Sequence, residues 1–345
     1  MPLTSSRSGQ TISHSGQKRR HMLALGTGLV ATPLRVLAQP AAKVRRIGFL
    51  GLRSRSTPSN PDVYSDAFVQ GLRDLGYIEG QNFIIEWRFA NLKYELVPRL
   101  AAELVQAKVE LIVTHNVAAT IALMKLTTTI PIVNVTMGDP VSQGFAASLA
   151  RPGGNVTGLS SIGPELVPKQ LELLMLATRK LSRVAILMHP NETSHAEILR
   201  VAQENASKVG ITMLPLTADT SDDIERAFAT MKRERAGAVI ILISSFFGSQ
   251  RRQIAGLAAQ LRLPSIYFAS EYAKAGGLMS YGNRQADQYR YGATYVDKIL
   301  KGAKPGDLPI EQPNRYYLTL NRKTAKTLGL TLPQEFLIRA DEVIE

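Results

Sequence analysis

The residues best suited to contact a ligand lie where predicted strands end. Ligands of open α/β sheets bind outside the carboxyl ends of the strands, so these positions are the first place to look for a site. We predict that the ligand-binding residues are Arg53, Asn116, Val117, Asp139, His189, Ser244, Ser245, Phe246 and Tyr281.

These residue types favour recognition of a small charged solute. Backbone N–H groups of the helix beginning near Ala118 could receive a carboxylate, and Asp139 could hold an ammonium group through a charge-assisted hydrogen bond. Aromatic rings such as Phe246 and Tyr281 could stack on an apolar ligand body. The alternatives are structural: Asp139 as a turn or cap residue, and the tyrosines as core or hinge packing.

Signals for catalysis and for cofactors are missing from the sequence. It contains no nucleotide-binding glycine loop and no nucleophile elbow, and it has no cysteine. His189 and His195 are six residues apart across a proline-containing turn, so they fit a polar loop better than a metal site. His115 closes a strand and fits a loop hydrogen-bonder better than a general base. We therefore predict a protein that is not an enzyme, with no catalytic residues, metal or cofactor.

Short β-rich runs alternate with amphipathic helices, which indicates an α/β fold with parallel sheets covered by helices on both faces. In the first half, strands are predicted at residues 46–51, 83–89, 109–114 and 130–135, and helices at 62–75, 97–106 and 118–126. The series then restarts, with helices at 166–177, 195–209, 222–232 and 250–261 and strands at 184–188, 212–216, 238–243 and 265–268. Two sheets of this size predict two Rossmann-like lobes.

Turn-forming residues mark the predicted passages between the lobes. Residues 138–158 contain Asp139-Pro140 and the turn 152–155, with a short helix expected at 143–150. The glycine-rich segment 276–282 resembles a second passage and the proline-rich segment 306–313 a third. Helix 285–300 should pack back on the first lobe. The predicted lobes comprise residues 44–158 with 281–312, and 159–280 with 313–345.

Residues 1–38 have the layout of an export signal. Arg19 and Arg20 precede a moderately apolar run, and small residues before Gln39 offer a cleavage site after Ala38. The paired arginines favour the twin-arginine route, with general secretion or an uncleaved basic tail as alternatives. The formal net charge of +13 falls to about +8 without this segment. No nucleic-acid recognition motif accompanies the basic residues, so we predict an exported, soluble, periplasmic protein that binds no nucleic acid.

Several long segments together resemble one known family. They are residues 68–77 (FVQGLRDLGY), the segment 138–158, residues 276–282 (GGLMSYG), residues 295–302 (YVDKILKG) and the carboxyl-terminal RADEVIE of residues 339–345. In this order they resemble the ABC-transporter substrate-binding proteins of the tryptophan/tyrosine-binding type. The resemblance covers residues 44–345 and implies a periplasmic-binding-protein fold of type I, with two lobes, three hinge crossovers and a ligand cleft.

The resemblance also implies a function and partners. It implies a monomeric extracytoplasmic receptor that captures a small solute by lobe closure and delivers it to an ABC permease with its ATPase. A sensor subunit that presents the same fold to a membrane signalling partner is the alternative. The chain departs from the family at two positions, with Val117 where a hydroxyl is common and Ser244 where an aspartate is common. An amino acid, another carboxylate or a small aromatic acid therefore remain open as ligands.

Overall fold

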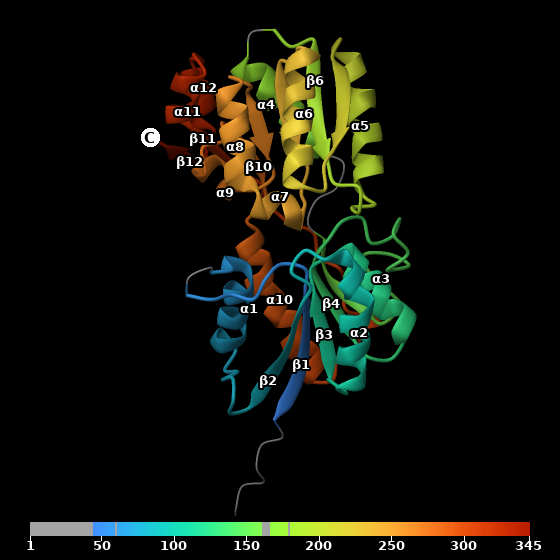
Figure 1. The fold of residues 1–345 in the computed structure, drawn as a ribbon. Coiled ribbons are helices and arrows are strands. Elements are labelled where there is room, and N and C mark those ends of the chain that lie inside the picture. Colours follow the sequence, from blue (N-terminus) through green and yellow to red (C-terminus); the bar gives the residue numbers. More distant parts are fainter. Residues whose placement is uncertain (1–43, 59–60, 161–165, 179) are drawn as a thin grey trace, which may run out of the picture. The chain divides into compact units, whose positions relative to one another are not determined.

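The structure, a computed structural model, describes residues 44–58, 61–160, 166–178 and 180–345. These residues form two sheets with helices packed on them (Figure 1). The predicted export signal, residues 1–38, lies outside the described residues. Within the described part, no helix combines the length and the apolar content that crossing a membrane requires.

The first sheet has five parallel strands in the order β2-β1-β3-β4-β5. They are β1 (Arg45–Gly51), β2 (Phe83–Phe89), β3 (Leu111–Thr114), β4 (Ile132–Met137) and β5 (Val156–Ser160). Every residue of the central strand β3 is buried, because helices cover both faces of the sheet. The carboxyl ends of these strands point toward the site described below.

Two pairs of helices cover this sheet. One face carries α1 (Val63–Asp74) and α10 (Gln285–Leu300), and the other carries α2 (Val97–Gln106) and α3 (Val117–Leu126). In α2 the residues at positions 97, 100, 101 and 104 are buried, which is the spacing of one helix face. The prediction that helix 285–300 packs on the first lobe is confirmed by its contacts with α1, β4 and β5.

Gly71 explains how closely α1 approaches α10. A Cβ atom at this position would lie 2.2 Å from the main-chain oxygen of Arg290 and 2.9 Å from the Cβ of Ala293. Only a residue without a side chain allows this approach. Gly71 belongs to the 68–77 segment that carries part of the family resemblance, so that segment marks a packing requirement of the fold.

The second sheet has seven strands in the order β12-β11-β10-β9-β8-β6-β7. They are β6 (Arg183–Met188), β7 (Thr212–Thr217), β8 (Ala238–Ile241), β9 (Ser265–Tyr267), β10 (Met279–Gly282), β11 (Tyr317–Asn321) and β12 (Glu342–Ile344). Strand β11 runs antiparallel to β10, and the other neighbouring pairs are parallel. The sequence did not predict β11 and β12, which complete one edge of this sheet.

Helices and two hydrophobic clusters enclose the second sheet on its two faces. The helices are α4 (Leu166–Ala177), α5 (His195–Lys208), α6 (Ser221–Arg233), α7 (Ser245–Ser249), α8 (Arg251–Gln260), α9 (Ser270–Lys274), α11 (Arg322–Thr327) and α12 (Gln334–Ile338). Helix α6 begins with a capping box, in which Thr220 and Asp223 satisfy each other's backbone N–H groups. The helix predicted at 250–261 is present as α8, and the short helix α7 before it was not predicted.

The chain passes between the sheets three times, as the sequence predicted. The passages follow β5, β10 and the short 3-10 helix η2 (Pro305–Asp307). Two of them lie side by side, because the Ser160 N–H donates to the Glu311 oxygen at 2.9 Å. Strand β5 continues to residue 160 and β10 to residue 282, so we propose these positions as the lobe boundaries in place of 158 and 280.

The expected role and structure of residues 138–155 need correction. This segment joins β4 to β5 of one sheet, so the first passage begins only after Ser160. The predicted helix at 143–150 is absent, and turns and bends occupy those residues. One turn forms after Pro140, and Gly144 then adopts φ +71°, which ends any helical path. The predicted sharp turn is present, with Gly153 at φ +77°.

Candidate functional site

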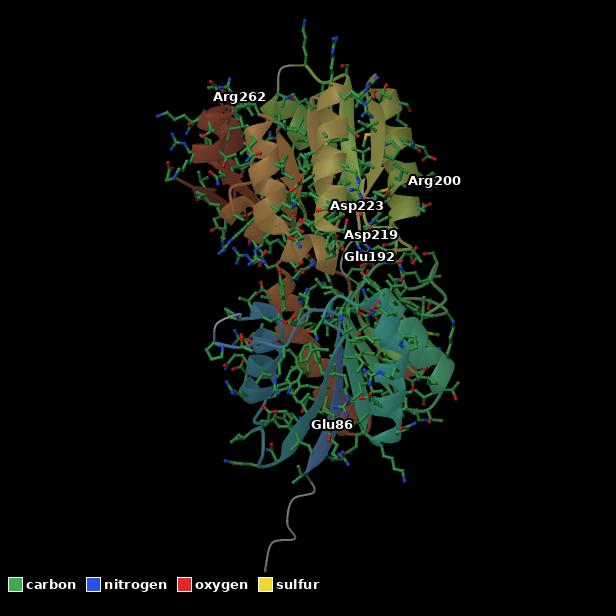
Figure 2. The ribbon with its side chains drawn as sticks, in the orientation of Figure 1. Glu86, Glu192, Arg200, Asp219, Asp223 and Arg262 are labelled. Carbon is green, nitrogen blue, oxygen red and sulfur yellow. The ribbon has the colours of Figure 1, made fainter. Side chains whose placement is uncertain are left out.

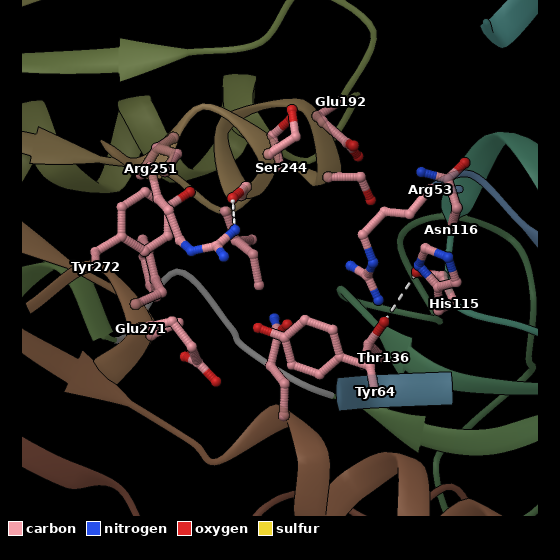
Figure 3. Close-up of a pocket in the computed structure, with 18 of the residues that line it drawn as sticks. Arg53, Tyr64, His115, Asn116, Thr136, Glu192, Ser244, Arg251, Glu271 and Tyr272 are labelled. Atoms are coloured by element: carbon pink, nitrogen blue, oxygen red, sulfur yellow. Dashed lines mark hydrogen bonds between the residues drawn. The ribbon is translucent and has the colours of Figure 1, made fainter. Parts of the chain in front are cut away.

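A cavity of about 280 Å³ lies between the carboxyl ends of the strands of the two sheets. Its walls come from the loops after β1, β3 and β4 of the first lobe and from those after β6, β8 and β9 of the second. Figure 3 shows Arg53 and Tyr64 facing Ser244, Arg251 and Tyr272 across this space. Strand ends from both lobes therefore converge on one pocket, which is the arrangement that the predicted fold requires.

Arg53 is the central charged group of the pocket. Its Nη2 donates to the hydroxyl oxygen of Tyr289 at 2.8 Å, and its guanidinium carbon lies 4.4 Å from the centre of the Tyr64 ring. Its Nε is buried without a hydrogen-bond partner and lies 3.5 Å from the carboxylate of Asp62. In Figure 3 the guanidinium points toward the middle of the cavity. A ligand carboxylate could pair with this group.

The surroundings of Arg53 keep it charged. Burial lowers the pKa of Arg53, but the neighbouring Tyr289, Asp62 and Tyr64 raise it, and the net pKa lies above the ordinary value. Burial raises the pKa of the Tyr64 and Tyr289 hydroxyls, so both remain protonated. The pocket therefore presents a fixed cation flanked by two neutral phenols.

The amino end of α3 forms the neighbouring wall. Asn116 caps this helix by accepting the Ala119 N–H at 3.3 Å, and both Asn116 and Val117 line the cavity. His115 accepts the Leu52 N–H through Nε2 at 3.2 Å, as expected of a loop hydrogen-bonder. Burial, followed by the charge of Arg53, lowers the pKa of His115 well below its ordinary value, so this ring is neutral.

The second lobe supplies polar and aromatic groups to the opposite wall. Ser244 and Ser245 stand at the start of α7, and the Ser244 Oγ accepts the Phe246 N–H at 3.2 Å. Arg251, Glu271 and Tyr272 complete this side (Figure 3). The Arg251 guanidinium donates to the Gly248 oxygen at 2.9 Å and remains exposed to solvent.

Glu192 lies on the edge of the second lobe that faces the first (Figure 2) and lines the cavity. Its carboxylate accepts a hydrogen bond of 3.1 Å from the hydroxyl of Tyr94, a residue of the first lobe. Burial raises the pKa of Glu192 to about 7, and the hydrogen bond from Tyr94 lowers it by a smaller amount. Glu192 therefore connects the two lobes and titrates near neutral pH.

The structure brings five of the nine predicted residues to the cavity wall and places four elsewhere. Those at the wall are Arg53, Asn116, Val117, Ser244 and Ser245. Asp139 is exposed, and its carboxylate accepts hydrogen bonds from the N–H groups of Val141 and Ser142. Asp139 therefore has the structural role of a turn residue, which was the alternative to ligand binding.

The other three residues pack beside the pocket. The rings of His189 and Phe246 are buried against each other with 5.5 Å between their centres, and Tyr281 packs on Tyr316. Burial lowers the pKa of His189 to about 4, so it is neutral at pH 7. Among the described residues, no group of three side chains suited to metal ligation occurs.

Sequence reasoning missed several residues of the wall. Asp62 could have been found as the N-cap of the helix after the first strand, since that position lies at the sheet's carboxyl edge. Glu192 likewise lies in the loop at the carboxyl end of a strand, β6. Tyr64 and Tyr289 sit on helices, and Tyr289 is 236 residues from Arg53 in the sequence, so no local signal connects the two.

The similarity of this chain to known proteins identifies its family. Residues 57–344 match the family described as ABC transporter substrate binding protein. The chain belongs to this family. A curated relative is the "Tyrosine-binding protein" of Clostridioides difficile (strain R20291), which is 23% identical over 270 residues, or 78% of this chain and 77% of the relative.

The similarity of this chain to solved structures agrees with its assignment to the substrate-binding protein family. A conserved domain protein from Vibrio cholerae is 26% identical with a TM-score of 0.81, covering 87% of this chain and 100% of that one. The ABC domain from Streptococcus pneumoniae in complex with L-Trp is 25% identical with a TM-score of 0.80, covering 88% and 100%. The predicted periplasmic-binding-protein fold of type I and the resemblance to the tryptophan/tyrosine-binding type are confirmed. The family binds solutes and is not a family of enzymes.

Proposed function

We propose that this chain is the extracytoplasmic receptor of an ABC importer and captures an aromatic amino acid, or a closely related aromatic carboxylate, by closure of its lobes. The observation that carries the proposal is the partly buried Arg53 guanidinium, which faces the cavity between the two lobes. A cavity of about 280 Å³ favours a small solute, since it lies near the lower limit of about 300 Å³ for small-molecule sites.

The aromatic body of the ligand would lie against the ring-bearing walls. Tyr64 and Tyr289 line the first lobe, and Phe268 and Tyr272 line the second. Rings stack on aromatic ligands in offset or tilted geometry. The known relatives support this choice, because one is named as tyrosine-binding and another was solved with L-Trp.

Glu271 is the carboxylate that we propose for the ligand ammonium. Three carboxylates line the cavity, and two of them already have partners: Asp62 lies by Arg53, and Glu192 accepts from Tyr94. Glu271 is partly buried and faces the space between the lobes (Figure 3). A carboxylate on one wall and a guanidinium on the other suit a zwitterion.

Export and delivery complete the proposal. The segment 1–38 would direct the chain out of the cytoplasm, and the closed, loaded monomer would dock on a membrane permease powered by an ATPase. Hinge segments at the three passages would absorb the backbone changes during closure.

The test is thermal unfolding of the mature chain with L-tryptophan, L-tyrosine, L-phenylalanine, indole-3-propionate and adenine, followed by calorimetry of each hit. We expect an aromatic amino acid to raise the melting temperature, because a ligand that binds only the folded state stabilises it. Glu271→Gln should remove the preference for L-tryptophan over indole-3-propionate, which lacks the ammonium group. Failure of every compound to bind would contradict the proposal.

A further inference from the structure

The loop after β2 contains an unusual backbone. Asn91 and Leu92 adopt φ 53° and 64°, and the Lys93 N–H donates to the Ala90 oxygen at 3.0 Å, which is the geometry of a type I′ turn. Asparagine tolerates the left-handed region, but leucine there is strained. The turn is anchored to the end of the first strand, because the Leu92 N–H donates to the Leu52 oxygen at 2.7 Å.

The other left-handed residues have a simple local cause. Among the described residues other than glycine, Lys108, Arg235 and Arg262 also have positive φ, and each directly follows the C-cap of a helix. A left-handed residue commonly ends a helix at that position. Leu92 lies in a turn after a strand instead, so contacts with other parts of the molecule must offset the strain at this residue.

Leu92 makes such contacts with both lobes. Its side chain packs against the cluster around α2 and α3 of the first lobe and against the cluster around α6 and α8 of the second. It also lines the cavity. The strained turn therefore places one apolar side chain across the boundary between the lobes.

Tyr94 makes the polar part of the same connection. Its ring stacks on His189 of the second lobe with 5.4 Å between centres and 24° between planes, and its hydroxyl donates to Glu192. The side chain of Asn116, in the first lobe, lies near the same hydroxyl and lowers its pKa, against the larger rise caused by burial and Glu192. Tyr94 thus links the cap of α3 to the loop after β6.

Leu92 and Tyr94 contact the second lobe, where the loop after β6 is held by its own hydrogen bonds. The His195 Nδ1 accepts the His189 N–H at 3.0 Å, and its Nε2 donates to the Ile243 oxygen at 3.0 Å. His195 is itself buried. The second lobe therefore offers a rigid surface of His189 and Glu192 to the tip of the first.

We propose that residues 91–94 form a clasp that holds the lobes together and retains the solute, with Leu92 as its apolar contact and Tyr94 as its polar one. The clasp extends the proposed function, because it sets how long a captured solute stays. Its loss should open the lobes and speed release, with little effect on the fold of either lobe.

Spin labels can measure the clasp without any ligand. The chain has no cysteine, so Lys125→Cys on α3 and Lys208→Cys on α5 provide unique attachment sites at exposed positions. Interspin distances would be measured for the parent and for Leu92→Ala and Tyr94→Phe, with and without L-tryptophan. We expect both variants to shift the population toward longer distances in at least one of the two conditions.

Tyr77→Phe is the matched control. It also removes a hydroxyl that donates to a carboxylate, Asp297 at 3.0 Å, but both partners belong to the first lobe. This control should match the parent. If L-tryptophan binds, its dissociation rate measured by stopped flow should rise about tenfold in Tyr94→Phe, as expected for a hydrogen bond to a carboxylate, and remain unchanged in Tyr77→Phe.

The outcomes separate the two proposals. Parent-like distances in both clasp variants, under both conditions, would overturn the clasp even if the chain binds amino acids. A parent that binds no amino acid but opens in the two variants would overturn the proposed ligand and leave the clasp standing.

Discussion

At the residue scale, Arg53 is the group in the cavity that is best placed to bind a ligand carboxylate. Two phenols hold the guanidinium in place, and its Nε has no hydrogen-bond partner. The ion pair with Asp62 at 3.5 Å is longer than a strong charge-assisted hydrogen bond. The Nε donor of Arg53 is therefore available to a ligand carboxylate while the two phenols keep the guanidinium in position.

Replacement of Arg53 should weaken binding selectively. Arg53→Gln removes a hydrogen bond to a charged group worth about 1.5–3 kcal/mol, so we expect the affinity for L-tryptophan to fall about 10- to 100-fold by calorimetry. Arg251→Gln removes an exposed arginine from the same cavity and should change the affinity less than about threefold, since exposed charges are screened. Equal losses in the two variants would argue against a specific role for Arg53.

Glu192 should make binding depend on pH. Its pKa is raised to about 7 by burial between the lobes, whereas an open cleft would return it to water and to its ordinary value of about 4.3. Closure then takes up a proton, so the closed state is favoured fully below the ordinary pKa and loses stability as pH rises toward and through 7.

The expected result is a fall in L-tryptophan affinity of at most tenfold per pH unit between about pH 5 and 7, followed by a plateau. Glu192→Gln should lack this slope, and the difference between the two curves removes any titration of the ligand itself. His189 and His195, with pKa values of about 4, do not titrate in this window. Parallel curves for parent and variant would exclude Glu192 as the source.

At the element scale, the sequence predicted regular elements well and the exceptions have local causes. Strand β2 and helix α10 have the predicted boundaries, because buried apolar residues of the right period are bounded by turn formers. The helix expected at 143–150 was inferred only from the turn-forming residues on either side of it, and Gly144 in the left-handed region prevents it. Contacts between distant segments were beyond prediction: Tyr94 donates to Glu192, which is 98 residues away, and no local sequence signal connects the two.

Gly71 gives an element-scale prediction. Gly71→Ala places a Cβ 2.2 Å from a main-chain oxygen of α10, so we expect the free energy of unfolding to fall by about 1–3 kcal/mol in urea denaturation. Gly256→Ala lies within α8 with no atom within 4 Å of the new Cβ, and should be neutral or stabilise by up to about 1 kcal/mol. A stable Gly71→Ala variant would mean that α1 and α10 are less tightly packed.

At the scale of the whole molecule, one arrangement accounts for the pocket, the clasp and the passages. Two sheets present the carboxyl ends of their strands to one cavity. The chain segments that connect the sheets include two that lie side by side, joined by the Ser160–Glu311 hydrogen bond. In the proposed closure, the lobes would move about the passages while Leu92 and Tyr94 make or break contact between the lobes. The chain belongs to the family of ABC transporter substrate binding proteins, and its relatives indicate the ligand class to test first.

A crystal structure of the mature chain with L-tryptophan or L-tyrosine tests the central claim most directly. The account predicts the ligand in the cavity between the lobes, with its carboxylate within hydrogen-bonding distance of Arg53 and its ammonium near Glu271. A bound ligand whose carboxylate contacts neither Arg53 nor the amino end of α3 would contradict it.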